Sequence, residues 1–165
     1  MANKPARRSA GVLLWQRDRA GLRVLLVHPG GPFWAKKDDG AWSIPKGEFG
    51  EGENALVVAR RELREELGRA AATLYDQPDG AFVALGEIKQ KGGKYVTAFA
   101  LEADFDVTKL ASNSFEMEWP PRSGRRQAFP EVDRADWFSL DEAQVKILVS
   151  QLPFLTTLAE LTGHS

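Results

Sequence analysis

The sequence predicts one layered domain that mixes strands and helices, of the α/β or α+β class. Three observations predict it: β-rich apolar runs, an amphipathic helical segment between residues 54 and 68, and the lack of any linker-like stretch. The 165 residues, 43% of them apolar, are enough to bury a sizeable core. The elements do not alternate in a regular βαβ rhythm, so these patterns alone leave the choice between the two classes open.

The N-terminal part of this domain predicts an antiparallel hairpin. Residues 11–15 and 22–28 are β-rich runs, and the polar stretch between them contains Asp18 and Gly21. Turn residues of this kind between two apolar runs are typical of a hairpin.

A loop rich in glycine and proline follows over residues 29–40. It is too polar for a core segment, yet it carries Phe33 and Trp34, two large aromatic residues, beside Lys36. Loops of this composition often carry function, so we place the two aromatic residues at the mouth of a site. Residues 41–45 then predict a short strand that ends at a proline.

The next segment predicts an amphipathic helix. Asn54 suits its N-cap, and Gly68 suits the position just after its end. At about 100° per residue its apolar side chains gather on one side, while its glutamates centre well away from them. The helix is therefore expected to bury one face and leave the other open, and its apolar positions are Leu56, Ala59, Leu63 and Leu67.

Strands predominate in the following part of the chain. Residues 81–88 and 94–102 predict two strands around a turn over residues 90–93. A further short strand ends at Trp137 and Phe138.

The C-terminal segment predicts helix. Ser139 and Glu142 have the spacing of a capping box, in which each side chain satisfies a backbone N–H of the other residue. The helical pattern then runs to about residue 161, and we expect two pieces split at Pro153.

Charge and composition exclude several classes of protein. The chain has 22 basic and 23 acidic residues and a net charge of −1, whereas general binders of nucleic acid or membrane surfaces need a basic excess. It contains no cysteine, which rules out disulfides and thiolate metal sites. We therefore expect neither nucleic acid nor membrane as a partner, and an anionic substrate must be met by local charge.

The N-terminus has two arginines before a short apolar run over residues 10–15. That run is too short for the apolar region of a secretory signal and is broken by polar residues. We expect a soluble cytoplasmic protein with a flexible tail over residues 1–8 and a single domain over residues 9–162.

Three carboxylates share one face of the predicted helix. Glu62, Glu65 and Glu66 stand at the i, i+3, i+4 spacing, where like charges destabilise a helix. A bound divalent cation is the simplest compensating charge, because Mg²⁺ prefers oxygen ligands. The alternative is a solvated acidic helix face, which is the ordinary interpretation of a short charge run.

These glutamates belong to a longer pattern with eight specified positions at fixed offsets, which makes an accidental match improbable. The pattern resembles the Nudix box, the signature of MutT-like hydrolases that cleave a diphosphate linked to another moiety. Arg69 departs from it, since the family usually has an aliphatic residue there, and this departure concerns local packing more than catalysis. The matching positions are Gly47, Glu53, Arg61, Glu62, Leu63, Glu65, Glu66 and Gly68.

The resemblance implies an α/β/α sandwich with a mixed sheet between helices. It also implies a Mg²⁺ or Mn²⁺ site on the three glutamates, which the backbone carbonyl of Gly47 commonly joins. Glu53 and Arg61 are then structural partners, an ion pair that orients the loop and the helix.

Members of the family often have one more carboxylate, in a loop before a late strand. The acidic stretch before Trp137 is the natural place, and Glu131 is the first choice there. Either Glu65 or Glu131 is then the general base that activates water. Glu116, Glu118 and Asp133 are the competitors for the additional carboxylate, and an ordinary loop glutamate is the alternative interpretation of Glu131.

Lys46 precedes the first glycine of the box, where an ammonium group is able to meet a substrate phosphate. A solvated surface lysine is an equal alternative. The Pro45-Lys46-Gly47 entry resembles dinucleoside polyphosphate and diphosphoinositol polyphosphate hydrolases, whereas enzymes that sanitise oxidised nucleotides more often have Pro-Gly-Gly.

Base recognition needs an aromatic platform, although most aromatic residues are simply core. Phe33 and Trp34 are the first choice. The segment from Glu116 to Arg126 is either a lid whose arginines reach a distal phosphate or an exposed rigid loop. His28 and His164 lack a second ligand at zinc spacing and receive no role. The other aromatic candidates are Trp42, Tyr95 and Trp119, and the arginines are Arg122, Arg125 and Arg126.

The predicted activity is Mg²⁺-dependent hydrolysis of a nucleoside diphosphate derivative, with diadenosine tetraphosphate as the leading substrate. The alternatives are an oxidised nucleoside triphosphate, and a sugar nucleotide or ADP-ribose. A non-catalytic nucleotide sensor normally goes with a degraded box, and here every metal-binding glutamate is present. A protein-interaction module built on the proline-rich Trp119 segment is a further alternative. We expect a monomer or a homodimer.

Overall fold

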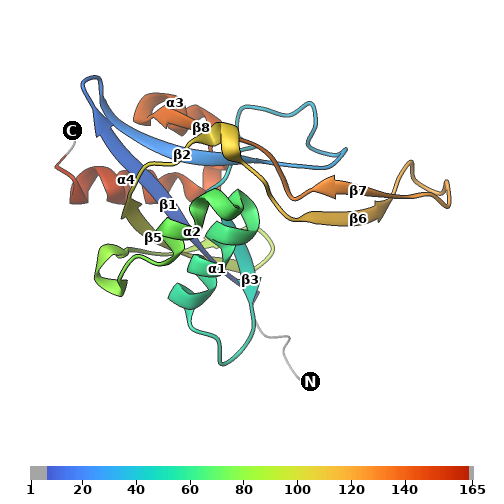
Figure 1. Ribbon diagram of the computed structural model, residues 1–165, viewed down its shortest axis with the longest axis horizontal. Coiled ribbons are helices and arrows are strands. Elements are labelled where there is room, and N and C mark those ends of the chain that lie inside the picture. Colours follow the sequence, from blue (N-terminus) through green and yellow to red (C-terminus); the bar gives the residue numbers. More distant parts are fainter. Residues whose placement is uncertain (1–6, 164–165) are drawn as a thin grey trace.

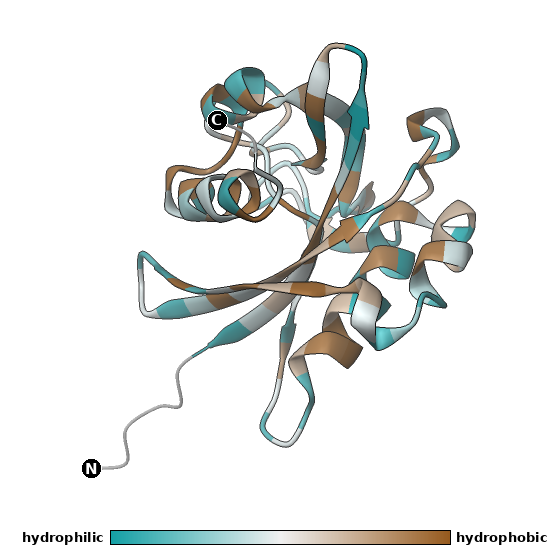
Figure 2. Cartoon of the chain, turned by 90° about the vertical axis from the view of Figure 1, so that its left-hand side faces the viewer, coloured by the Kyte–Doolittle hydropathy of each residue, from teal (hydrophilic) through white to brown (hydrophobic). Residues whose placement is uncertain are grey.

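The computed structural model describes residues 7–163 and has the sandwich that the sequence predicts, with a mixed sheet between two groups of helices (Figures 1 and 2). Of the tail expected over residues 1–8, residues 1–6 lie outside the described residues. The strands are β1 (Arg8–Asp18), β2 (Gly21–Pro29), β3 (Lys46–Phe49), β4 (Val83–Gln90), β5 (Lys94–Glu102), β6 (Ser114–Glu118), β7 (Arg126–Pro130) and β8 (Val132–Ser139), and the helices are α1 (Ala55–Leu67), α2 (Ala72–Tyr75), α3 (Leu140–Lys146) and α4 (Leu152–Leu161).

The main sheet has six strands in the order β4-β5-β1-β2-β8, and β3 pairs with β1. β1 and β2 form the predicted hairpin, with Trp15 opposite Val24. β1 runs parallel to β5 and antiparallel to β2 and β3, so the sheet is mixed. The pair Ala10 and Gly47 sets the register of β3 against β1.

Both faces of the central strands β1 and β2 are buried, which explains the nearly continuous apolar runs of these two strands. Alternate residues of β1 point to opposite sides: Leu13 packs in the core under α3 and α4, whereas Val12 and Leu14 pack in the core under α1. Figure 2 shows the two groups of helices on either side of the strands. The sheet thus fixes α1 on one face, where the box glutamates lie.

The prediction of a strand over residues 41–45 is wrong. Trp42 and Ser43 make only isolated bridges, and the strand begins one residue later, at Lys46. The side chain of Gln151 accepts the N–H of Ile44, at 3.1 Å, a bond that a neighbouring strand would otherwise make. Ile44 and Gln151 are 107 positions apart, so no local sequence pattern predicts this contact.

The capping box of Ser139 and Glu142 is confirmed, with both side-chain bonds present at the start of α3. The C-terminal helix is in two pieces as predicted, but the break lies at residues 147–151 and not at Pro153. Pro153 stands in the first turn of α4, where a backbone N–H would have no acceptor within the helix, so the N–H that proline lacks costs no hydrogen bond. Among residues 7–163 every helix is too short or too polar to cross a bilayer.

Candidate active site

Local sequence determines both ends of α1. The side chain of Asn54 accepts the N–H groups of Leu56 and Val57, at 2.9 and 3.3 Å, so it caps the helix as predicted. Glu53 accepts the Gly50 N–H at 3.0 Å and pairs with Arg61 at 3.2 Å. This ion pair ties the loop before the helix to its second turn.

Glu62 is buried, with an exposed fraction of 6%, so the expectation that all three glutamates lie on an open face is wrong for this residue. It lies under β3, where Gly47 has no side chain. A Cβ on Gly47 would come within 2.1 Å of the Glu62 carboxyl carbon. Burial, and then the charge of Glu65, raise the pKa of Glu62 to about 7.

Glu66 lies beside Lys46 at the start of β3. Its Oε2 accepts the Lys46 backbone N–H at 3.3 Å. Burial raises the pKa of Glu66 well above its usual range, and the charge of Glu62 adds to the rise. Burial also lowers the pKa of the Lys46 ammonium group, although the charge of Glu66 opposes this. The site therefore disfavours charge on both partners, and a cation between the carboxylates would relieve the repulsion among them.

Glu131 joins these glutamates from the segment between β7 and β8. Its N–H donates to the Asn113 carbonyl at 2.8 Å, and the Asn113 N–H donates to the Glu65 carbonyl at 2.8 Å. This backbone relay holds Glu131 near the end of α1. Burial and the charge of Glu65 raise the pKa of Glu131.

The competing carboxylates lie elsewhere and have other partners. Glu116 pairs with Arg126 at 3.8 Å, and Glu118 accepts the Gly124 N–H at 3.0 Å. Asp133 contacts Nδ1 of His28 at 2.7 Å. Of the four candidate carboxylates, the structure thus places Glu131 near the box glutamates, and the other three have partners elsewhere.

A cavity of about 200 Å³ opens beside this cluster. Its polar wall contains Lys46, Glu66 and Glu131, and Trp34 lies on its rim loop. The rest of the lining is mostly apolar and forms a floor that suits a flat or ring-shaped group, while the polar wall suits an anionic one. The remaining lining residues are Val27, Pro29, Ala41, Ser43, Ile44, Val132 and Leu148.

The donor chemistry of this cluster fits a hard divalent cation, because it offers carboxylate oxygens that repel one another. The residues that would hold the ion are the three box glutamates, Glu131 and the Gly47 carbonyl. No three His, Asp or Glu side chains within residues 7–163 stand close enough to share one ion in this structure.

Four residues predicted to bind substrate do not line this cavity. Phe33 is 62% exposed, and Lys36 is exposed on the same loop. Tyr95 lies on β5 between Arg8 and Lys89, whose charged groups are 5.5 and 5.9 Å from its ring centre.

Arg125 is the fourth, and it stands at the turn between β6 and β7, where its carbonyl accepts the Trp119 N–H. The hairpin that these strands form was not predicted as such, because its segment resembled a lid or a rigid loop. Arg69, the departure from the box, is exposed in a short 3₁₀ turn, and Ala71 supplies the buried apolar contact instead.

His28 is a residue that sequence reasoning missed. It is fully buried, and its ring nitrogens lie 2.7 Å from an Asp133 carboxylate oxygen and 2.6 Å from the Lys37 carbonyl. His28 ties the loop of Trp34 to β8. His164 lies outside the described residues.

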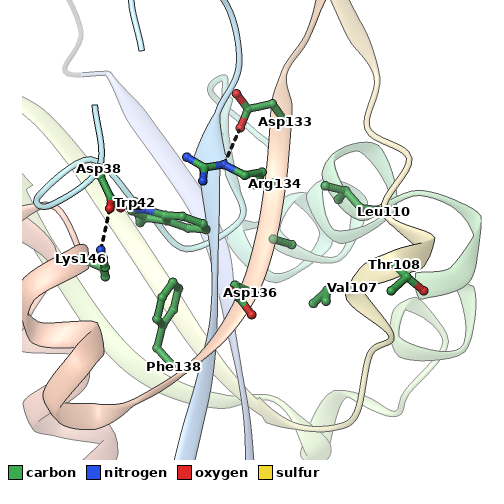
Figure 3. A pocket seen from close by; sticks show the side chains of 11 residues that line it. Asp38, Trp42, Val107, Thr108, Leu110, Asp133, Arg134, Asp136, Phe138 and Lys146 are labelled. Carbon is green, nitrogen blue, oxygen red and sulfur yellow. Dashed lines mark hydrogen bonds and ion pairs between the residues drawn. The ribbon is translucent and has the colours of Figure 1, made fainter. Parts of the chain in front are cut away.

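A second cavity, of about 440 Å³, lies at β8 and is lined by residues of this strand and of neighbouring segments (Figure 3). Trp42 lies here and is 96% buried against Phe138, so it is a core residue and not a base platform. Lys146 pairs with Asp38 at 2.7 Å, and Arg134 with Asp133 at 3.9 Å. The box glutamates and Glu131 do not line this cavity, which separates it from the candidate active site.

The fold and this site define a Nudix-type α/β/α sandwich with its acidic box complete. The chain belongs to the NUDIX domain family, whose model matches residues 5–157. Two curated relatives are RNA pyrophosphohydrolases: that of Caulobacter vibrioides is 36% identical over 69 residues, 39% of this chain and 40% of that protein, and that of Rhizobium meliloti is 29% identical over 109 residues, 61% and 60%. The chain thus spans less than two thirds of either relative. The crystal structure of a Caenorhabditis elegans Ap4A hydrolase binary complex has a TM-score of 0.61 and 18% identity, over 95% of this chain and 99% of that one, which shows the shared fold.

Proposed function

We propose that this chain is a Mg²⁺-dependent pyrophosphohydrolase that cleaves a phosphoanhydride bond in a nucleotide with a polyphosphate chain. One observation supports this above the others: Glu66, Glu131 and Lys46 line one cavity, and Glu62 is buried just behind it under Gly47. Such a site offers cation ligands and a place for phosphate on the same wall. Membership of the NUDIX domain family supports this proposal.

Each residue has a distinct role in this proposal. A divalent cation would neutralise phosphate oxygens and make the phosphorus accessible to water. Glu62, Glu65, Glu66 and the Gly47 carbonyl would hold it, and Glu131 would either join them or act as the general base. Lys46, where charged, would meet a phosphate oxygen, and Trp34 would cover the group seated on the apolar floor.

The base that takes the proton of the attacking water would be Glu65 or Glu131. Glu131 is the better candidate, because its pKa is raised and a carboxylate accepts protons more readily as its pKa approaches the working pH. Arg61 is bound to Glu53 and would position the helix without touching the substrate.

The leading substrate is a dinucleoside polyphosphate such as diadenosine tetraphosphate, which the Pro45-Lys46-Gly47 entry favours. A second candidate is the 5′ polyphosphate of an RNA, because the curated relatives are RNA pyrophosphohydrolases. Both substrates present a polyphosphate on a nucleoside 5′ oxygen. The second moiety is a nucleoside at the far end of the polyphosphate in the first substrate, and the RNA chain on the 3′ side of the nucleoside in the second.

The test is Mg²⁺-dependent hydrolysis of both substrates, beside ADP-ribose, a sugar nucleotide and an oxidised dGTP, with products identified by mass. Glu65→Gln and Glu131→Gln remove one charge each from the site. Glu160→Gln, an exposed carboxylate on α4, is the matched control. We expect the two site variants to lose about a hundredfold or more in kcat, in keeping with a general base, and the control to keep its rate.

Preference for ADP-ribose, a sugar nucleotide or the oxidised nucleotide would keep the catalytic site and overturn the substrate assignment. Metal-dependent binding with no turnover of any of them would instead support a nucleotide sensor. Hydrolysis that is unchanged in both site variants would contradict the proposed centre altogether.

A further inference from the structure

β6 and β7 form an arm, residues 114–130, that pairs only with itself as a separate two-stranded sheet. The arm projects from the body of the molecule, away from α3 and α4 (Figure 1). Its base adjoins the candidate active site, because Pro130 is followed directly by Glu131 and the Glu131 carbonyl accepts the Gly30 N–H at 2.9 Å. A substrate chain that leaves the candidate active site on the side of Glu131 would therefore lie along the arm.

The loop of Phe33 runs beside this arm and touches it twice. At the base, Phe115 lies so close to Gly31 that a Cβ there would come within 2.9 Å of its ring. Further out, the rings of Phe33 and Trp119 meet edge to face, with centres 5.4 Å apart. Neither Phe33 nor Trp119 belongs to the two apolar cores of the described chain. The pair is thus an aromatic surface outside both cores, and Phe33 is 62% exposed.

The outer part of the arm, residues 119–126, carries Arg122, Arg125 and Arg126 and no acidic residue. Arg126 pairs with Glu116 further in. Arg122 and Arg125 are exposed and form no ion pair with any carboxylate in the part of the chain that the structure describes. The tip therefore presents cationic groups beside the aromatic pair, although the whole chain has a net charge of −1.

We propose that the arm and Phe33 form a binding surface for the single-stranded RNA that follows a 5′ polyphosphate, an inference that rests on the proposed pyrophosphohydrolase function. Aromatic side chains stack on bases of any sequence, and arginines bind the phosphates between them. The five residues of β6 span about 17 Å, which corresponds to roughly five stacked nucleotides at about 3.4 Å each. A dinucleoside polyphosphate has only one further base and would leave most of this surface empty.

The proposal reverses the expectation that nucleic acid is not a partner. That expectation came from the balanced charge of the whole chain, whereas the arm concentrates its basic residues at one tip. A local surface of this kind binds one strand entering one site, and it needs no basic excess elsewhere.

Binding is measured on the full chain with RNA that ends in a 5′ monophosphate, so that the readout needs no catalysis. Fluorescence anisotropy compares a labelled strand of about ten nucleotides with one of two. We expect the longer strand to bind at least tenfold more tightly. Trp119→Ala should weaken its binding by about fivefold to a hundredfold, the effect of one lost base stack.

The double variant Arg122→Ala and Arg125→Ala tests the charge separately, on side chains whose removal leaves the strands intact. Each phosphate contact on a single strand contributes about 0.7 to the slope of log affinity against log salt, so we expect the slope to fall by about 1.4. Arg19→Ala is the matched control, since Arg19 is an exposed arginine in the turn between β1 and β2. Its affinity and salt slope should equal those of the wild type.

Equal affinity for the two lengths, or unchanged binding in both arm variants, would overturn the arm as an RNA surface even if the enzyme hydrolyses its substrates. Length-dependent binding that the variants weaken, in a protein without hydrolysis, would support the surface and overturn the proposed activity instead. If Trp119→Ala changes the oligomeric state and leaves RNA affinity unaltered, the aromatic pair covers a second copy of the chain and the proposal fails.

Discussion

The Glu62 carboxyl group occupies the space that a Cβ on residue 47 would take, and this space is free because residue 47 is glycine. Because a Cβ on residue 47 would stand 2.1 Å from the Glu62 carboxyl carbon, only glycine allows β3 to lie against α1 at this point. The specified glycine of the box thus has a steric role beside the one its carbonyl would have toward a cation. At the residue scale, the site depends on a missing side chain as much as on those present.

Gly47→Ala should therefore displace Glu62 and lower kcat by about tenfold or more, with a weaker apparent affinity for Mg²⁺. Steady-state kinetics across a Mg²⁺ titration measures both. Gly50→Ala is the control, because its added Cβ would meet only a Glu53 oxygen at 3.8 Å, an ordinary contact. Equal kinetics of the two variants would rule out the steric role.

The raised pKa of Glu62 makes a prediction for stability without metal. Below its ordinary value of 4.5 the group is protonated in both states, and between 4.5 and about 7 only the folded protein retains the proton. The folded state then binds more protons, so its stability falls as the pH rises through this window, and the loss is complete above about 7. We expect the metal-free Tm to fall by a few degrees between pH 5 and pH 7.5.

Differential scanning fluorimetry across this pH range checks it. Glu62→Gln should flatten the curve, and Glu160→Gln should leave it as in the wild type. Added Mg²⁺ should restore the Tm most at the upper end of the range, where the carboxylates are charged. A wild-type curve that coincides with that of Glu62→Gln would contradict the assignment.

At the element scale, the loop over residues 30–42 carries Trp34 to the site, and His28 links this loop to the sheet. His28 lies on β2, its carboxylate partner Asp133 on β8, and its carbonyl partner Lys37 in the loop. The loop has no regular ladder of its own beyond isolated bridges at Trp42 and Ser43. The buried His28 ring is thus one attachment of this loop, beside the ion pairs that Lys146 makes with Asp38 and Asp39.

His28→Leu should destabilise the protein by about 1–3 kcal/mol, because the Asp133 carboxylate and the Lys37 carbonyl lose their partner on the ring and a leucine of similar size makes no hydrogen bond. With Trp34 less firmly held, KM should rise more than kcat falls. Thermal unfolding and steady-state kinetics measure the two effects.

Arg134→Ala is the control for His28→Leu. Arg134 contacts Asp133 from the solvent side at 3.9 Å, and an exposed ion pair of this kind contributes little. If His28→Leu keeps both the stability and the KM of the wild type, the ring does not position the loop.

At the scale of the whole molecule, the sheet separates two apolar cores that support different parts of the protein. The core under α1 contains Leu63 and Leu67 and supports the box, whereas the core under α3 and α4 contains Phe154 and Leu158. Side chains of the same strands serve both, since neighbouring residues point to opposite faces. Stability and catalysis are therefore partly separable by side of the sheet.

Phe154→Ala should reduce stability by about 3–5 kcal/mol, because it removes a ring that is 1% exposed. The Tm should fall by roughly 6–20 °C, at about 2–4 °C per kcal/mol for a chain of this size. Below its own transition the variant should keep kcat within about twofold, since no residue of α4 lines the catalytic cavity.

Calorimetry and kinetics on the same samples test this separation. Val149→Ala, at a position that is 75% exposed, should change neither quantity. Leu63→Ala should lower both, because Leu63 adjoins Glu62 in the core under α1. A large loss of kcat in Phe154→Ala at low temperature would contradict the separation.

The sequence by itself determined the features that depend on neighbours along the chain. These are the β1–β2 hairpin, the capped helix α1 with its three glutamates, the capping box of α3 and the family to which the box belongs. Their signals are turn residues, caps and periodicity, which act within a few positions. The same local rules misjudged Pro153, because they cannot tell a helix break from a helix start.

Only the tertiary structure decided which distant residues meet. It placed Glu131 near Glu65 and Glu66, and it buried Glu62 under Gly47. It also replaced the expected strand over residues 41–45 by β3 and gave His28 partners 105 and 9 positions away. It also turned the segment around Trp119 into an arm beside the Phe33 loop. Such contacts depend on the packing of the sheet and helices, and no spacing within the chain encodes them.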